Sequence, residues 1–360
     1  MPEALNKLAG LLQDWFARDG NSPNKLEGLL VEYGGGLGKI DRRKLGALSR
    51  GEDAALSFAQ MKALEAFLTK EYRQTFASLF EPSALMPSLL LNNHVKVFLG
   101  SQPRHSSSEP PLRRTDISRW DVDAMRVVWQ SINKVSGTVK LDFEDVLCTD
   151  SANAAPSTWS SELIGRGTKK SMVSIGSQRA NPATELMLAS MFGVVNAQDP
   201  ASSMLPFHFV WDQPSKRPSA FSKEVSKIPQ SLMKQARVKK REKAPWALEV
   251  NGEYYLLERF VQKSKAYGVL AAQRRSFGNS GSQVWLVLAG LSGPGTAATA
   301  RFIEDDELSL PRIERGNHSN VLWMAVEADV ELIETPGDNR IIGEPRKLCD
   351  PQIWEPPSAQ

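Results

Sequence analysis

Three segments of the chain carry the residue types best suited to bind a small ligand. Each shows an apolar run, then glycine, then small or polar residues, and then the start of an expected helix: KVFLGSQPR at 96–104, SMVSIGSQRANPATE at 171–185 and VWLVLAGLSGPGTAATA at 284–300. In an open α/β sheet, ligands bind in the crevice at the carboxyl ends of the strands, where helix N-termini present unpaired N–H groups that favour anions. We therefore expect the three strand ends to converge on one cleft for an anionic, nucleotide-like ligand.

The second segment offers the most specific side chains for such a cleft. Asn181 is expected to cap a helix that opens with Pro182, which leaves Ser177 and Arg179 in the preceding loop. We expect Gly176, Ser177, Arg179 and Asn181 to contact the ligand. A guanidinium presents two parallel N–H groups to a phosphate or carboxylate, so Arg179 is the expected anion clamp. The alternative is that Gly176 forms only a tight turn and that Arg179 makes an ordinary surface ion pair.

The third segment contains a glycine-rich loop, GLSGPGT at 290–296, that could cradle a phosphate. Gly293 and Gly295 would allow close approach of the backbone, and Thr296 could cap the following helix and contact an oxygen. The loop lacks the lysine of a Walker motif, and its glycine spacing differs from that of the GxGxxG dinucleotide motif. The alternative is a turn that needs its glycines only for packing.

The first segment contributes Gly100 and Ser101 to the expected cleft and leads into DISRWDVDAM at 116–125. Ser118 suits the cap of a helix in that stretch. Trp120 follows in the first turn, where it is expected either in the core or as a surface on which a base stacks. Of these two roles the core is the commoner for a tryptophan.

Catalytic machinery is only weakly indicated. Glu185 falls in the first turn of the helix after the second segment, where it could contact a ribose hydroxyl, act as a base, or simply favour the helix dipole. No nucleophile elbow, HExxH motif or paired-cysteine motif accompanies the four histidines and two cysteines, which are His94, His105, His208, His318, Cys148 and Cys349. His208 alternates with apolar neighbours, which predicts a core histidine. We expect no metal centre and no resident cofactor, and whether the chain is an enzyme stays open.

The elements that must position these residues change in pattern near residue 95. Before it, apolar residues recur at helical spacing; after it, short apolar segments typical of strands are separated by helical stretches. This alternation predicts an α/β fold with a Rossmann-like, mixed and mainly parallel sheet, and Asn251-Gly252 predicts a hairpin that adds an antiparallel portion. The expected domains are an all-α helical domain at 1–90, an α/β ligand-binding domain at 91–345 with a mobile basic insertion at 213–243, and a C-terminal tail at 346–360.

The helices of the first domain are marked by caps and stops. The first ends at Asp19-Gly20, and Ser22-Pro23 begins a second that stops at Gly34-Gly35-Gly36. A third is expected near 41–49, and Ser57 precedes a fourth. The domain is therefore expected to be built from short amphipathic helices.

Three of these helices resemble a lambda-repressor-like helix-turn-helix domain. The resemblance covers about residues 26–68, with LEGLLVEYG as the supporting helix, KIDRRKLGALSRGED as the recognition helix and LSFAQMKALEAFL as the packing helix. It implies that the second of these helices enters the major groove of DNA. Arg42, Arg43 and Lys44 would then lie near bases or phosphates, and Arg50 near the DNA backbone.

Two features of this region depart from the family. The connection at 34–40 is longer and richer in glycine than the usual three or four residues, and residues 1–76 carry 11 basic against 10 acidic side chains. A DNA-binding domain usually has a stronger positive charge. A helical protein-interaction or dimerisation module is therefore the alternative.

The overall composition limits the class of protein. With 360 residues, 41% of them hydrophobic and 24% charged, the chain is expected to fold, and a net charge of +3 is too small to indicate a nucleic-acid partner by itself. The longest apolar run, at 284–291, is too short to span a bilayer, so no membrane contact is expected. Two cysteines indicate no disulfide scaffold and favour the cytoplasm.

We interpret the chain as a cytoplasmic, ligand-responsive regulator that acts as a homodimer. Its helical domain would bind DNA, and its α/β domain would bind a small anionic, nucleotide-like molecule. One alternative is a nucleotide- or NAD-processing enzyme with a helical adaptor domain. Another is a structural adaptor whose cleft holds no ligand, because a fold alone does not fix a function.

Overall fold

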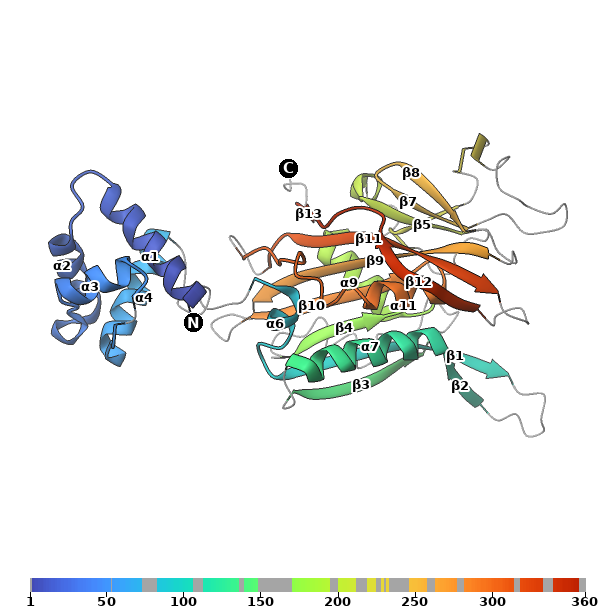
Figure 1. Ribbon diagram of the computed structural model, residues 1–360, viewed down its shortest axis with the longest axis horizontal. Helices are drawn as coiled ribbons and strands as arrows, with labels where there is room; N and C mark the ends of the chain where they lie inside the picture. The colour runs from blue at the N-terminus through green and yellow to red at the C-terminus, as the bar shows by residue number, and fades with distance from the viewer. Residues whose placement is uncertain are drawn as a thin grey trace. The chain divides into compact units, whose positions relative to one another are not determined.

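The computed structural model divides the chain into two compact units, Met1–Pro82 and Ser83–Gln360 (Figure 1). In the first unit the described residues form helices only, and in the second they form two sheets and several helices. The structure describes residues 2–52, 54–72, 83–105, 113–135, 139–147, 170–194, 200–211, 219–224, 228–229, 231–232, 246–257, 263–276, 282–313, 318–332 and 339–355.

The described residues of the first unit form four helices and one short 3-10 turn, namely α1 (Pro2–Ala17), α2 (Pro23–Gly34), η1 (Gly36–Gly38), α3 (Arg42–Ser49) and α4 (Phe58–Tyr72). The hydroxyl of Ser22 accepts a hydrogen bond from the Lys25 amide, and Pro23 occupies the first turn, as the sequence predicts. Asp41 caps α3 in the same way. The apolar faces of the helices meet in one core around Trp15, Leu30 and Phe67.

The glycine-rich connection between α2 and α3 packs against α4. A Cβ atom added at Gly34 would lie 2.7 Å from the Cβ of Ala63, and one added at Gly38 would lie 2.8 Å from the carbonyl oxygen of Leu30. Gly35 between them has φ of 65°, a conformation that favours glycine. The length and the glycine content of this connection therefore follow from close packing rather than from a short turn between two helices.

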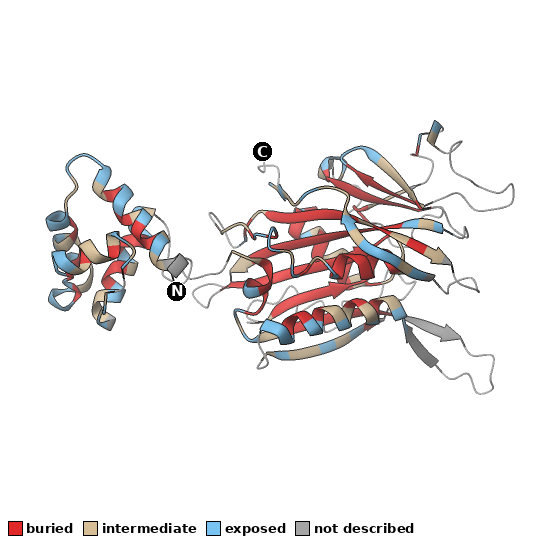
Figure 2. Ribbon diagram, viewed as in Figure 1, coloured by how far each residue is buried: buried red, intermediate tan, exposed pale blue. Residues whose placement is uncertain are grey.

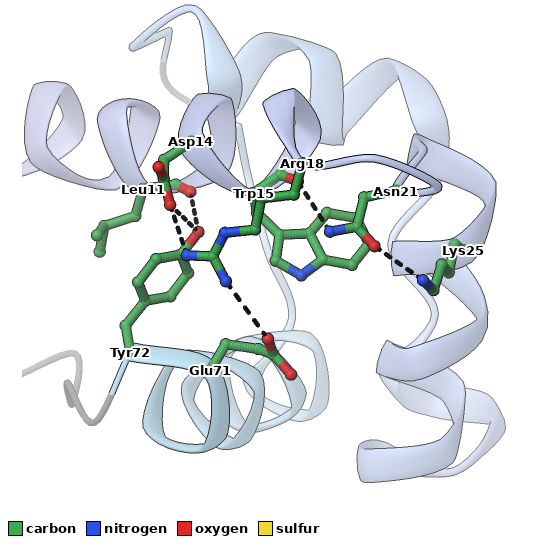
Figure 3. Close-up of polar contacts among 8 residues, drawn as sticks. All are labelled: Leu11, Asp14, Trp15, Arg18, Asn21, Lys25, Glu71 and Tyr72. Atoms are coloured by element: carbon green, nitrogen blue, oxygen red, sulfur yellow. Dashed lines mark hydrogen bonds and ion pairs between the residues drawn. The ribbon is translucent and has the colours of Figure 1, made fainter.

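A polar network joins the ends of α1 and α4 (Figure 3). The Tyr72 hydroxyl lies 2.7 Å from the Leu11 carbonyl oxygen and 3.0 Å from Asp14 Oδ2, and Arg18 donates to the same carboxylate at 2.6 Å. The guanidinium of Arg18 also lies over the Tyr72 ring, 5.0 Å from its centroid, and 3.9 Å from Glu71. Partial burial and the bond to Asp14 raise the pKa of Tyr72 to about 12.

The second unit is built on a nine-stranded sheet in the order β12-β11-β9-β10-β4-β1-β2, with β13 paired to β11 and β3 paired to β1. Its elements in chain order are α6 (Leu85–Leu89), β1 (His94–His105), β2 (Arg113–Ile117), α7 (Arg119–Val135), β3 (Lys140–Leu147), β4 (Ser171–Ile175), α9 (Pro182–Phe192), η2 (Pro200–Met204), β5 (Phe207–Trp211), β6 (Ser222–Glu224), β7 (Trp246–Val250), β8 (Glu253–Leu257), β9 (Lys263–Ser276), β10 (Ser282–Gly290), α11 (Gly293–Ala300), β11 (Val321–Leu332), β12 (Asn339–Lys347) and β13 (Gln352–Trp354).

The expectation of a mainly parallel sheet is wrong. Only the pairs β3/β1, β1/β4 and β4/β10 are parallel, and the remaining pairs of the large sheet, from β10/β9 to β11/β12 and including β1/β2, are antiparallel. The physical reason is connection length. Short connections join β9 to β10 and β11 to β12, and a short connection permits only a hairpin, whereas a parallel pair needs a long crossover such as the one that contains α7.

The buried strands separate two apolar cores (Figure 2). Alternate residues of each strand enter opposite cores, so that Phe98 and Trp285 lie on one face while Leu99 and Leu286 lie on the other. Helix α9 and the second sheet cover the first face, and helices α6, α7 and α11 belong to the core of the second. The large sheet is therefore the middle of three layers.

The second sheet has four strands in the order β6-β5-β7-β8. The predicted hairpin at Asn251-Gly252 is confirmed, because β7 and β8 pair antiparallel and the two turn residues have φ of 49° and 86°. The expectation that 213–243 is a mobile insertion is wrong for its described part, since β6 pairs with β5 and Phe221 is fully buried. The basic stretch 234–243 lies outside the described residues.

The two domain boundaries in the structure differ from those expected from the sequence. Helix α6 was assigned to the helical domain that ends at 90, but Leu85 donates to the Leu308 carbonyl oxygen and its side chain is buried in the core of the second unit. The first unit therefore ends at Pro82. The tail at 346–360 is not separate either, because β12 extends to Lys347 and β13 pairs with β11.

Candidate functional site

The carboxyl ends of three parallel strands meet at one edge of the large sheet. Leu99 of β1 and Leu288 of β10 are both in register with Ile175 of β4, so the residues that follow these strands lie next to one another. The loop from Gly176 to Asn181, which we call the Gly176 loop, joins β4 to α9 at the centre of this edge. The prediction that these three strand ends converge is therefore confirmed.

The Gly176 loop is held rigidly at its first residue. Gly176 has φ of 113°, which an L-residue rarely adopts. Its amide donates to the Leu288 carbonyl oxygen at 2.9 Å, and its own carbonyl oxygen accepts from the Thr184 hydroxyl at 2.9 Å. The first residue of the loop is thus fixed between β10 and α9.

Asn181, expected to contact the ligand, instead holds the loop together from inside. Its side chain is fully buried; Nδ2 lies within hydrogen-bond distance of the carbonyl oxygens of Ile175 and Phe98, and Oδ1 accepts from the Ala183 amide at 3.0 Å. The predicted cap of α9 is confirmed. Because protein groups use both polar ends of the amide, Asn181 positions the loop and is not open to a ligand.

The residues at the end of β1 also lie beneath the loop. A Cβ atom added at Gly100 would lie 2.5 Å from the Ala180 carbonyl oxygen, so glycine is required there for packing. Ser101 is fully buried, and its hydroxyl lies 3.4 Å from Asp145 Oδ2. Gly100 has no side chain, and the buried side chain of Ser101 does not reach the surface of the expected cleft.

Ser177 and Arg179 are half-buried in the loop, as is Ala180. The Ser177 carbonyl oxygen accepts from the amides of Ala180 and Asn181, which closes the turn. The guanidinium of Arg179 lies over the ring of Trp211 on β5, 5.4 Å from its centroid. Arg179 therefore lies on the side of the loop that faces the second sheet.

The glycine-rich loop before α11 is explained by packing. A Cβ atom at Gly295 would lie 2.0 Å from the Tyr267 carbonyl oxygen, and one at Gly293 would lie 2.4 Å from the Trp120 ring. Thr296 is buried and its amide donates to the Ser292 carbonyl oxygen. These glycines let α11 approach β9 and α7, so the expectation of a phosphate cradle is replaced by the packing alternative.

Asp121 is the residue that the sequence reasoning missed. It lies in the first turn of α7, it is 4% exposed, and its Oδ2 would be 3.1 Å from a Cβ atom at Gly176. Neither carboxylate oxygen has a hydrogen-bond or ion-pair partner within the part of the chain that the structure describes. Burial alone raises the pKa of this carboxyl from its usual 3.8 to about 7.

Two further polar atoms near this edge are buried without a partner among the described residues, namely Gln178 Oε1 and Ser292 Oγ. Gln178 belongs to the Gly176 loop and donates from Nε2 to the Ser222 hydroxyl on β6 at 3.2 Å. Ser292 precedes α11 and makes no side-chain cap bond. Orphaned buried polar atoms are uncommon and are typical of sites that bind a ligand or a water molecule.

Glu185, a possible catalytic or ribose-binding residue, and His208 both make hydrogen bonds or close polar contacts within the protein. Glu185 is half-buried and accepts a short hydrogen bond from the Ser219 hydroxyl. His208 is buried; its Nε2 lies 2.9 Å from the Ser202 carbonyl oxygen, and its Nδ1 lies 3.4 Å from Glu249. The prediction of a core histidine is confirmed.

The four basic residues expected at DNA differ in their surroundings. Arg42 and Arg43 are exposed in the first turn of α3, and Arg42 lies 4.0 Å from Glu27. Lys44 donates to the Ala55 carbonyl oxygen at 2.7 Å, and Arg50 makes two hydrogen bonds to Glu52. Arg42, Arg43 and Arg50 are therefore exposed, and Arg50 is the one held in a two-bond contact with Glu52.

A separate groove of about 530 Å³ is lined by residues of β8, β9, β11 and β12, which are Leu256, Lys263, Ser264, Lys265, Tyr267, Asp329, Val330 and Ile342. The ammonium of Lys265 is paired with Glu327 at 2.8 Å. The walls of this groove combine apolar residues with positive and negative side chains whose charges largely cancel. The groove therefore offers a less specific set of ligand-binding groups than the surroundings of Asp121.

The comparisons with known proteins leave the site to be interpreted on its geometry. No family model matches the chain, and no curated protein or solved structure matches it significantly. Among the described residues, no cluster of three His, Cys, Asp or Glu side chains could hold a metal ion. Within the same residues, no helix has the length and apolar character needed to cross a membrane.

Proposed function

We propose that the second unit binds a small nucleotide-like ligand at the Gly176 loop, and that the chain is a cytoplasmic regulator which responds to this ligand. The observation that carries the proposal is the buried and unpartnered carboxylate of Asp121 beside Gly176. The parallel strands β3, β1, β4 and β10 support a Rossmann-like arrangement, in which ligands bind at the carboxyl edge of the strands.

Stability alone does not account for Asp121. A buried carboxylate without partners opposes folding, and a neutral side chain of similar shape would remove that penalty. Strongly shifted carboxyl groups collect at functional sites, where the cost in stability is offset by ligand binding or catalysis. The position of Asp121, beside Gly176 at the strand ends, fits this explanation.

The test is calorimetric titration of the full chain with a panel of ribonucleoside triphosphates. Asp121→Asn should weaken binding about tenfold or more, because a hydrogen bond to a charged group contributes about 1.5 to 3 kcal/mol. The matched control is Asp123→Asn, which removes a carboxylate two residues along the same helix, where it faces Arg126 at 3.6 Å. Equal affinity in Asp121→Asn and the wild type, or no binding by any member of the panel, would overturn the proposal.

We also propose that the helical unit binds duplex DNA and that the regulator acts as a dimer. The supporting observation is the pair of exposed guanidinium groups, Arg42 and Arg43, in the first turn of the helix that resembles a recognition helix. A gel shift with random duplex at low salt tests the first part. Sedimentation equilibrium tests the second, and a monomer at micromolar concentration would contradict it.

A nucleotide- or NAD-processing enzyme is the second candidate function. It is favoured by the pKa of about 7 at Asp121, because a general acid or base works best when its pKa is near the operating pH. Incubation of the chain with each bound nucleotide, followed by chromatography, separates the two candidates. Turnover that Asp121→Asn abolishes would support the enzyme, and recovery of intact nucleotide would support the sensor.

A further inference from the structure

The unsatisfied groups at the candidate site have a common chemical character. Ionised Asp121 and the Oε1 atom of Gln178 are both hydrogen-bond acceptors, and each residue is 4% exposed. Gln178 Oε1 has no donor among the described residues, and no hydrogen bond from them contributes to the pKa of Asp121. Because a buried acceptor is stabilised only when a donor reaches it, ionised Asp121 favours a part of a ligand that brings hydrogen-bond donors.

A phosphate group does not meet this requirement. Near neutral pH its oxygens are acceptors that carry negative charge, and the ionised form of Asp121 in a poorly hydrated site repels them. The neighbouring helix α11 gives no compensating cradle, because Gly293 and Gly295 are in close contact with Trp120 and Tyr267. The anionic end of a nucleotide therefore has no favourable place next to Asp121.

The sugar of a nucleotide does meet it. A ribose carries two adjacent hydroxyl groups, and the two oxygens of one carboxylate can accept a hydrogen bond from each. An acidic side chain near the carboxyl ends of the strands receives ribose hydroxyls in many doubly wound sheets. Asp121 begins α7 at the edge where β1, β4 and β10 end.

We infer that Asp121 binds the 2′,3′-hydroxyl pair of a ribonucleoside, so that this site recognises the sugar of its ligand and excludes phosphate from the position beside Gly176. The inference rests on the proposed function and specifies which part of the ligand the site recognises. No charged side chain among the described residues contributes to the raised pKa of Asp121.

The experiment is a cycle that alters the ligand and the protein in turn. The full chain is titrated with the four ribonucleoside triphosphates and with their 2′,3′-dideoxy counterparts. In the wild type the dideoxy compound should bind about tenfold to a hundredfold more weakly than its ribose parent. In Asp121→Asn this ratio should fall, and in Asp121→Leu, which can neither accept nor donate, it should approach one.

Asp123→Asn is the control, and it should keep the wild-type ratio. Thermal melts establish that each variant is folded before it is titrated. If ribose and dideoxy compounds bind equally to the wild type while Asp121→Asn weakens both, the proposed function stands and the inference about the sugar is wrong. If no triphosphate binds, or if Asp121→Asn binds all of them like the wild type, both the proposed function and the inference are wrong.

Discussion

At the scale of single residues, the protein keeps one carboxyl group in surroundings that oppose its charge. Asp121 is almost fully buried, and among the described residues its raised pKa is caused by the loss of water alone. Asp142 is a contrast within the same unit, because hydrogen bonds from His94 and Lys170 lower the pKa of that carboxyl to about 2. The chain can therefore provide partners for a carboxylate, and at Asp121 it does not.

Asp121→Asn should stabilise the second unit at neutral and alkaline pH. The pKa of Asp121 is about 7 in the folded protein, whereas its ordinary value, which applies to the unfolded chain, is 3.8. Between these two pH values the folded chain therefore holds a proton that the unfolded chain releases. The free energy of unfolding therefore falls as the pH rises from about 4 to about 7, by up to about 4 kcal/mol at roughly 1.4 kcal/mol per pKa unit. Denaturant melts of the wild type and the variant between pH 4 and pH 8 measure this difference.

The gap between the two proteins should widen across that window and stay constant above it. A gap that does not change with pH would show that Asp121 titrates normally in the folded state. Asp123→Asn, which alters a more exposed carboxylate two residues along the same helix, is the control.

Gly295→Ala should destabilise the second unit without acting on a ligand. Its Cβ atom would lie 2.0 Å from the Tyr267 carbonyl oxygen, which is backbone and cannot swing aside. Overpacking of this kind typically costs about 1 to 3 kcal/mol or more. Gly343→Ala is the comparison, since it meets no atom within 4 Å and bears only the strain of φ at 72°.

Differential scanning calorimetry of both glycine variants checks this expectation. A melting temperature for Gly295→Ala at or above that of Gly343→Ala would contradict the packing role of the α11 loop. If Gly295→Ala is fully folded under the assay conditions and still loses nucleotide affinity, the α11 loop belongs to the candidate site after all.

At the scale of elements, the contact between α1 and α4 depends on polar groups as well as on the core. Tyr72→Phe should lower the stability of the helical unit by about 0.5 to 1.5 kcal/mol, because the hydroxyl bonds to both the Leu11 carbonyl oxygen and Asp14. Hydrogen exchange of the amides in α1 and α4 measures the loss. Tyr33→Phe, which removes the phenol hydroxyl of a residue in α2, is the comparison.

Local signals in the sequence predicted most of these elements. The caps at Ser22 and Asn181 and the turn at Asn251-Gly252 act through neighbouring backbone groups, so residues close in sequence determine them. The ends of β1, β4 and β10 were predicted for the same reason. Spacing along the chain cannot show which strands pair, and the antiparallel half of the large sheet was missed on that account.

The candidate site was predicted only in outline. Gly100, Asn181 and Gly295 were expected to contact a ligand, yet their neighbours in space are Ala180, the backbone of two strands, and Tyr267. Asp121 could not be identified, since a first-turn aspartate is ordinary in sequence and its burial beside Gly176 arises from residues far apart in the chain. Burial and missing partners are properties of the fold.

At the scale of the whole molecule, two units with different chemistry share one chain. The helical unit carries exposed positive charge at Arg42 and Arg43, while Lys44 is engaged with the Ala55 carbonyl oxygen. If the unit binds DNA, replacing Arg42 and Arg43 with Ala should weaken binding and flatten the logarithmic salt dependence by about 0.9 for each lost phosphate contact. Fluorescence anisotropy at several salt concentrations measures this slope.

An unchanged slope would remove α3 from the DNA interface. Lys44→Ala is a separate variant, because the loss of its hydrogen bond to the backbone can alter the fold of the unit as well as its charge. The pair Arg42 and Arg43 gives the cleaner test, since both side chains are exposed.

The central claim is that a ligand ionises Asp121 when it binds beside Gly176, and proton release measures this most directly. At pH 6 a carboxyl with a pKa near 7 is mostly protonated, and donors from a ligand stabilise its charged form. Titration of the wild type with a ribonucleotide in two buffers of different ionisation enthalpy should show release of nearly one proton per site, and Asp121→Asn should release none. A binding enthalpy that is independent of the buffer in the wild type would contradict the account.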